Sequence, residues 1–204
     1  MSANKADIRA ILGASGSGKS TLAKRMSAKA TRLIVWDPLR EYGDHGTVYA
    51  PDQLGALAAS LVRVNGGRIR AVYQPPRDPK QMAARFAQLC KLAWHAGRLM
   101  FIVEELRFVT RPSFAPMEWS EVTLTGRHQG LTVIGTSQRP AHIDKDFLGN
   151  ATEIYCGTLG YRNDIQAAAD ALMIDAGQIG ALPPLEFLHL TKSPRKTKKI
   201  SITF

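Results

Sequence analysis

The stretch GASGSGKST, at positions 13–21, constrains the fold of this chain more than any other. It matches the pattern G-x-x-x-x-G-K-[ST], in which a glycine-rich loop ends in a lysine and a hydroxyl residue. The short apolar run IRAIL at 8–12 leads into it, and KSTLAKRMSAKA at 19–30 continues with helical spacing. This order predicts a strand, a phosphate-binding loop and a helix, which together bind a nucleoside triphosphate.

Each part of the loop has an expected task. Glycines let backbone N–H groups approach the phosphates, and the helix that follows adds the positive end of its dipole. We expect Lys19 to reach the β- and γ-phosphates of ATP and the Ser20 hydroxyl to bind Mg²⁺, while Thr21 supports the site from behind. The predicted nucleotide-binding residues are Gly13, Ala14, Ser15, Gly16, Ser17, Gly18, Lys19, Ser20 and Thr21.

Apolar runs that read as buried strands alternate with helical segments along the chain. The strands are expected at 8–12, 32–37, 69–74, 98–106, 131–140 and 152–159. The helices are expected at 19–30, 51–64, 77–97, 120–130 and 163–173, with Asp52 and Asp78 as N-caps, Pro79 at a first position and Gly97 as a stop. This alternation predicts an α/β fold with a mostly parallel sheet covered by helices on both faces.

The length of 204 residues suits one domain. We expect a core at about 6–182, followed at about 183–204 by a short antiparallel β pair and a basic tail, with strands at 186–191 and 199–204. No apolar run is long enough for a transmembrane segment, and the two cysteines imply no disulfide framework, so a cytoplasmic location is expected.

Two carboxylates end the fourth predicted strand, in FIVEE at 101–105. Ligands of open α/β sheets bind at the carboxyl ends of the strands, so both groups are expected near the phosphate loop. We assign Glu104 to Mg²⁺, through water, and Glu105 to the activation of the attacking water. A carboxylate that activates water is needed by an NTP hydrolase, whereas a kinase avoids such a water.

The next strand ends in polar residues, within TGRHQGLTVIGTSQRP at 125–140. Gln138 is expected to read the γ-phosphate, and Arg127 precedes the strand in a glycine-flanked segment. The blocks 13–21, EE and TSQRP, in this order, resemble the FtsK–HerA superfamily of DNA-translocating ATPases. WDPLREY at 36–42 is similar to the D-P-x-x-E-Y of HerA-like members.

Within that superfamily, the short chain looks most like the genome-packaging ATPases of tailless, membrane-containing viruses and phages. The resemblance implies a RecA-like core and a homo-oligomeric ring, a hexamer, with ATP held between subunits. It makes Arg127 the arginine finger supplied in trans to the neighbouring subunit, with Arg139 as the second candidate, and it gives Asp37 a part in holding the site. A capsid or portal-vertex protein is a candidate docking partner.

The net charge of +10 favours a polyanionic partner. Half of the excess lies in TKSPRKTKKI at 191–200, which has five basic residues and no acid, a composition that is also typical of a solvated tail. Together with this charge, the resemblance implies sequence-independent binding of double-stranded DNA. Two alternatives stay open, a small-molecule P-loop kinase and a nucleotide-binding assembly protein with little turnover.

Overall fold

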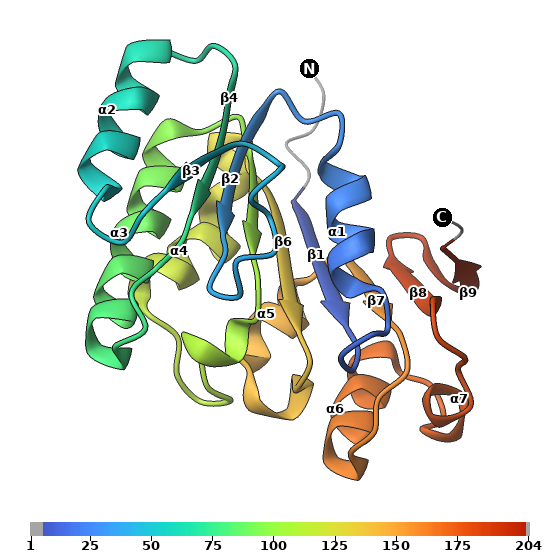
Figure 1. Ribbon diagram of the computed structural model, residues 1–204. Helices are drawn as coiled ribbons and strands as arrows, with labels where there is room; N and C mark the ends of the chain where they lie inside the picture. The colour runs from blue at the N-terminus through green and yellow to red at the C-terminus, as the bar shows by residue number, and fades with distance from the viewer. Residues whose placement is uncertain (1–5, 203–204) are drawn as a thin grey trace.

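The apolar runs of the sequence form the middle of one parallel sheet. The computed structural model describes residues 6–202, and in this part of the chain nine strands make a single sheet in the order β3-β4-β2-β5-β6-β1-β7-β8-β9 (Figure 1). The strands are β1 (Asp7–Leu12), β2 (Arg32–Trp36), β3 (Thr47–Tyr49), β4 (Ile69–Tyr73), β5 (Met100–Val103), β6 (Thr132–Ser137), β7 (Glu153–Cys156), β8 (Glu186–Lys192) and β9 (Arg195–Ser201). The first seven run parallel, and β8 and β9 are antiparallel to their neighbours, as predicted.

Helices cover both faces of the sheet, but unequally. The helices are α1 (Lys19–Ser27), α2 (Leu54–Val64), α3 (Pro79–Ala96), α4 (Met117–Thr125), α5 (Lys145–Asn150), α6 (Arg162–Leu172) and α7 (Gly177–Gly180). Helices α2 to α7 share the larger core, to which Phe86, Trp119 and Phe147 contribute fully buried rings. On the other face α1 packs with Tyr42 of the segment after β2. The predicted α/β class is confirmed.

Helix α3 begins and ends where the sequence predicts. The Asp78 side chain accepts a hydrogen bond from the Gln81 N–H at 2.9 Å, Pro79 is the first helical residue, and Gly97 follows the last. The predicted helix at 51–64 is present as α2 and ends at Val64, but its predicted start was wrong, because the helix begins at Leu54 and Asp52 does not cap it. Residues 51–53 form a turn instead, closed by the Gln53 N–H on the Ala50 carbonyl at 2.9 Å.

The C-terminal pair starts earlier than predicted. Its second strand was expected at 199–204, after a basic tail, but β9 already begins at Arg195 and contains the basic residues of that segment. Every residue of β9 is paired with β8, from Arg195 opposite Lys192 to Ser201 opposite Glu186. The end of the predicted strand, residues 203–204, lies outside the described residues. Strand β3 and helices α5 and α7 were not predicted at all.

The register of the central strands brings their carboxyl ends to one edge. In the order β5-β6-β1, Val103 lies opposite Gly135, and Leu12 lies opposite Ser137. The residues that follow these strands therefore meet at the same edge of the sheet. None of the helices in residues 6–202 is both long and apolar enough to cross a bilayer.

Candidate nucleotide-binding site

The glycine-rich loop joins β1 to α1 in a backbone conformation that requires glycine. Gly16 and Gly18 have φ angles of 77° and 96°, in the left-handed region. A Cβ atom on Gly13 would lie 2.5 Å from Oγ of Ser17. Backbone hydrogen bonds fix the loop to its neighbours, from Gly13 N to the Ser137 carbonyl at 3.1 Å and from Ala14 N to the Thr158 carbonyl at 2.8 Å.

Lys19 lies inside the loop. Its side chain is almost fully buried, and Nζ donates a hydrogen bond to the Ala14 carbonyl at 3.1 Å. Burial lowers the pKa of the Lys19 ammonium, and the carboxylates of Glu105, Glu104 and Glu41 oppose that shift. The buried Oγ of Ser17 has no hydrogen-bond partner among residues 6–202. A buried cation and an unpaired hydroxyl in a loop of glycines fit an anion such as a phosphate group.

A cavity of about 260 Å³ opens beside the loop. Residues of the loop and of helix α1 line one side, and Glu104 and Gln138 line the other. The loop and helix residues are Ser15, Gly16, Gly18, Lys19, Ser20 and Thr21. Glu41, Leu39 and Leu185 complete the wall. The structure thus brings six of the nine predicted nucleotide-binding residues into one space with Glu104 and Gln138, whereas Glu105 and Arg127 do not line it.

Three side-chain oxygens converge at the start of α1. The Ser20 hydroxyl lies 2.9 Å from Oε1 of Glu104 and 2.8 Å from Oε2 of Glu41. Glu104 is buried, and its other oxygen accepts a hydrogen bond from the Tyr42 hydroxyl at 3.1 Å. Burial raises the pKa of the Glu104 carboxyl, and the hydrogen bonds from Ser20 and Tyr42 partly offset it. Hydroxyl and carboxylate oxygens are the ligands that Mg²⁺ prefers, so the donor set fits this ion.

Asp37 organises the segment that carries Glu41. Its buried carboxylate accepts hydrogen bonds from the backbone N–H groups of Glu41 at 2.9 Å and Tyr42 at 3.0 Å. The D-P-x-x-E-Y pattern is therefore one structural unit, in which the aspartate closes a turn and the last two residues point to Ser20 and Glu104. Glu41 was not predicted as a site residue, and this pattern is the signal that could have identified it.

Glu105 occupies a strained turn directly after Glu104. Its backbone is left-handed, with φ of 54°, and its side chain is buried. The carboxylate accepts hydrogen bonds from the Gln138 N–H at 3.2 and 3.3 Å and from the Ser137 hydroxyl at 3.3 Å. Burial raises the pKa of the Glu105 carboxyl. The hydrogen bond from the Gln138 N–H and the positive charges of Arg107 and Lys19 lower that pKa and partly offset the effect of burial. A buried carboxylate with a raised pKa is typical of a general base.

The two arginines considered as fingers lie in different surroundings. Nε of Arg139 lies 2.6 Å from Oδ2 of the fully buried Asp164, and its guanidinium also lies over the ring of Tyr161. Arg127 is exposed in the short 3₁₀ turn Gly126–Gln129, before β6. This turn is at the amino end of β6, whereas the phosphate loop is at the carboxyl edge. Arg127 therefore does not reach the loop of its own chain.

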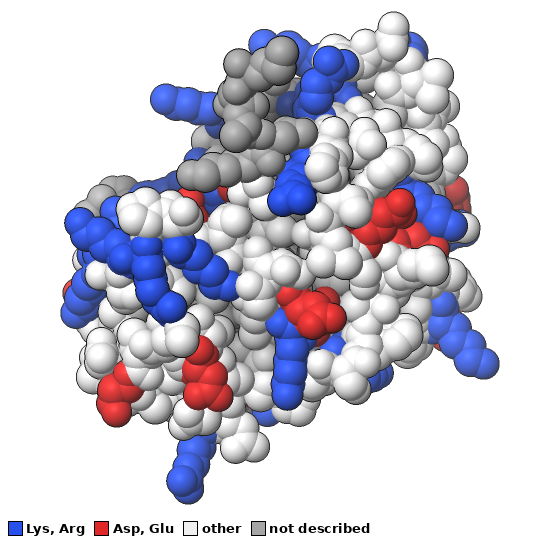
Figure 2. Space-filling model, turned by 180° about the vertical axis from the view of Figure 1, so that it is seen from behind, with Lys and Arg blue, Asp and Glu red and all other residues white. Residues whose placement is uncertain are grey.

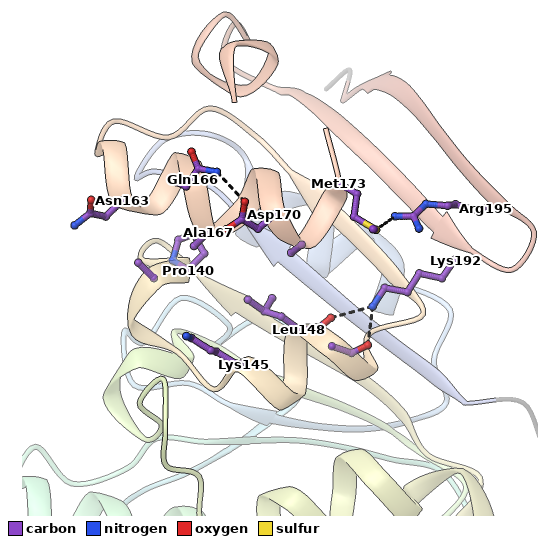
Figure 3. A pocket seen from close by; sticks show the side chains of 13 residues that line it. Pro140, Lys145, Leu148, Asn163, Gln166, Ala167, Asp170, Met173, Lys192 and Arg195 are labelled. Atoms are coloured by element: carbon purple, nitrogen blue, oxygen red, sulfur yellow. Dashed lines mark hydrogen bonds between the residues drawn. The ribbon is translucent and has the colours of Figure 1, made fainter. Parts of the chain in front are cut away.

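A second, larger cavity of about 870 Å³ lies away from this site, between α5, α6 and the β8–β9 hairpin (Figure 3). No residue of the phosphate loop lines it. The ammonium of Lys192 on its wall donates hydrogen bonds to the carbonyls of Leu148 and Gly149, at the end of α5. This lysine is thus used in packing, and the smaller cavity is the candidate site.

Comparison with known proteins identifies the family. No protein-family model matches the sequence. Protein P9 of Pseudoalteromonas phage PM2 is 30% identical over 202 residues, which cover 95% of this chain and 89% of that protein. The chain belongs to the family of Protein P9. This relative is a phage protein, which is consistent with the resemblance inferred from the three sequence blocks.

Two solved structures share the fold of this chain. The genome packaging NTPase B204 of Sulfolobus turreted icosahedral virus 2, in complex with ATP-gammaS, matches this P9-family chain over the full length of both, with TM-score 0.78 and 20% identity. VirB4 of Thermoanaerobacter pseudethanolicus matches with TM-score 0.73 and 13% identity, over 100% of this chain and 92% of that one. At these identities the likeness establishes the shared fold.

Proposed function

We propose that this P9-family chain hydrolyses ATP to move double-stranded DNA, as the genome-packaging motor of a virus. The observation that supports it most is the single cavity in which Lys19, Ser20, Glu104 and Gln138 meet, with Glu105 buried behind it and held by Gln138. A kinase requires the loop but not the second carboxylate. The proposed motor is a single domain of 204 residues that acts in the host cytoplasm or the virion.

The proposed reaction is attack of water on the γ-phosphorus of ATP. The new P–O bond forms as the bond to the β–γ bridging oxygen breaks, and ADP leaves with that oxygen. Glu105 takes the proton of the water. The neighbouring Glu104 accepts hydrogen bonds from the Ser20 and Tyr42 hydroxyls, whereas Glu105 accepts one from the Ser137 hydroxyl and from neither of those two. Lys19 stabilises charge on the transferring phosphoryl group. Gln138, which directly follows β6, senses the departure of the γ-phosphate.

Mg²⁺ fits beside Ser20. The Ser20 hydroxyl would hold the ion directly, and Glu104 and Glu41 would hold its water ligands. When bound, the ion would neutralise charge on the β- and γ-phosphates. The protein itself holds the Ser20, Glu41 and Glu104 oxygens together. Asp37 accepts a hydrogen bond from the Glu41 N–H, and the Tyr42 hydroxyl donates one to Glu104.

The proposed assembly is a ring, a hexamer, in which Arg127 acts in trans. Its position at the amino edge of the sheet, remote from the loop of its own chain, supports a role toward a neighbouring subunit. An arginine finger increases hydrolysis by roughly 10³–10⁵-fold. Double-stranded DNA is the proposed substrate because the chain carries a charge of +10, and contacts to phosphates suit a motor that moves any sequence.

On the face that Figure 2 shows, the basic side chains do not form one continuous patch. They gather at the left edge and again at the top, with uncharged and acidic surface between these groups. A capsid or portal-vertex protein remains the proposed docking partner of the ring.

The test of this function is the ATPase rate with and without duplex DNA of unrelated sequences. A DNA motor should turn over ATP faster with any duplex. A kinase should transfer phosphate to a small acceptor and ignore DNA, and a nucleotide-binding assembly protein should bind ATP with little turnover in either condition.

A further inference from the structure

A segment with an unusual surface follows Glu105. Residues 107–114, RFVTRPSF, contain two arginines, two phenylalanines and no acid. The side chain of Arg107 is 40% exposed, Phe108 is 40% exposed and Phe114 is 62% exposed, and Arg111 is also exposed. Guanidinium groups bind phosphates, and apolar side chains can pack on the adjoining sugars, so this combination suits a nucleic-acid backbone.

The segment is held firmly at its base and at its tip. The buried Thr110 hydroxyl donates to the Leu106 carbonyl at 3.1 Å and accepts from the Asp144 N–H at 3.3 Å. At the tip, Arg111 and Phe114 exchange two backbone hydrogen bonds, at 2.8 and 3.1 Å. The exposed side chains are thus presented from an ordered turn attached to the end of β5.

One ion pair connects this surface to the proposed catalytic base. Nε of Arg107 lies 3.3 Å from Oε1 of Glu105. The carboxylate is 1% exposed, whereas the arginine side chain is 40% exposed, so the pair extends from the interior of the site to solvent. A guanidinium has five N–H donors, and one contact to Glu105 leaves donors for a second anion.

We propose that the 107–114 segment binds the phosphate backbone of duplex DNA, and that a phosphate draws Arg107 away from Glu105 and so accelerates hydrolysis. This inference rests on the proposed function. While Arg107 is paired with Glu105, its guanidinium occupies Oε1 of the carboxylate, which also accepts from the Ser137 hydroxyl, so this oxygen is not available to the attacking water. A phosphate accepts two parallel N–H bonds from a guanidinium, which a single Nε contact does not provide.

The experiment compares the full chain with Arg107→Ala, Arg107→Lys and the matched control Arg63→Ala, an exposed arginine on α2. ATPase rates are measured with and without duplex. Arg107→Ala should raise the DNA-free rate by about two- to fivefold, the change expected from loss of a partly exposed ion pair, and DNA should then stimulate it less. Arg107→Lys should keep the low DNA-free rate, and Arg63→Ala should match the wild type.

A second measurement follows binding to a fluorescent duplex by anisotropy, in which Arg107→Ala/Arg111→Ala should bind more weakly than the wild type. If the wild type is stimulated by DNA but Arg107→Ala keeps its DNA-free rate and its stimulation ratio, this inference is wrong and the proposed function stands. If no duplex stimulates the wild type, the proposed function fails as well. If Arg107→Ala needs a higher protein concentration than the wild type to reach its full rate while duplex affinity is unchanged, this inference is wrong and the segment contacts a second copy of the chain instead.

Discussion

The hydroxyl oxygen of Ser20 lies 2.8 Å from Oε2 of Glu41, a residue 21 positions further along the chain. The contact adds a second carboxylate to the side of the phosphate loop where the predicted Glu104 already lies. It makes the segment after β2 part of the nucleotide site. The phosphate loop is thus completed by two acidic segments, one after β2 and one after β5.

Glu41→Gln should weaken nucleotide binding in the presence of Mg²⁺ more than in its absence. The substitution keeps the size of the side chain but removes the charge that would hold a water ligand of the ion. Titration of a fluorescent ATP analogue with Mg²⁺ and with EDTA measures both affinities. Glu121→Gln, at an exposed position on α4, is the matched control. Equal loss of affinity in both conditions would exclude the proposed role toward the ion.

Asp37→Ala should destabilise the fold and the site together. The substitution leaves the backbone N–H groups of Glu41 and Tyr42 without their acceptor, which costs about 1–3 kcal/mol for each group that stays buried. Urea unfolding measures the stability, and Mg²⁺-dependent ATP binding measures the site. Asp37→Asn retains one acceptor oxygen and should lose less. An unchanged midpoint in Asp37→Ala would show that the turn does not depend on this carboxylate.

Lys19→Ala and Glu105→Gln should separate binding from turnover. Without the Lys19 ammonium, both ATP binding and hydrolysis should weaken. Glu105→Gln should bind ATP with Mg²⁺ and hydrolyse it very slowly, because an amide does not accept the proton of the attacking water. Binding by fluorescence and phosphate release on the same samples distinguish the two. Near wild-type turnover in Glu105→Gln would show that Glu105 does not activate the water, and Glu104 would become the candidate base.

Arg127→Ala should fold, bind ATP and hydrolyse it poorly, and its defect should be rescued in mixtures. Combined with Glu105→Gln subunits, some interfaces would hold an intact Arg127 from one variant and an intact Glu105 from the other. Those interfaces should recover ATPase activity. Arg139→Ala should instead lower the urea midpoint, since it leaves the buried Asp164 without its charged partner. Full activity in Arg127→Ala would rule this residue out as the finger.

The positions of Glu104, Glu105 and Gln138 could be predicted because they depend on one rule of parallel sheets. Each follows an apolar strand, and the carboxyl ends of neighbouring strands meet at one edge. The order β5-β6-β1 places those ends side by side. The phosphate loop could be predicted for a local reason, since its glycines are required by the backbone angles themselves.

The contact of Glu41 with Ser20 and the early start of β9 were not predicted, because both depend on contacts distant in sequence. Glu41 reaches Ser20 only after Asp37 has closed the turn that carries it. Strand β9 consists mostly of basic and polar residues, which read as a solvated tail, and its pairing with β8 makes it a strand. Strand β3 has only three residues, too few to show a period.

Displacement of a fluorescent third strand from a triplex on duplex DNA tests translocation directly. The wild type should remove the third strand only with ATP and Mg²⁺, on tracks of unrelated sequence, and Glu105→Gln should not. A wild type that hydrolyses ATP in the presence of duplex DNA but never displaces the third strand would contradict the proposal that this chain is a DNA-translocating motor.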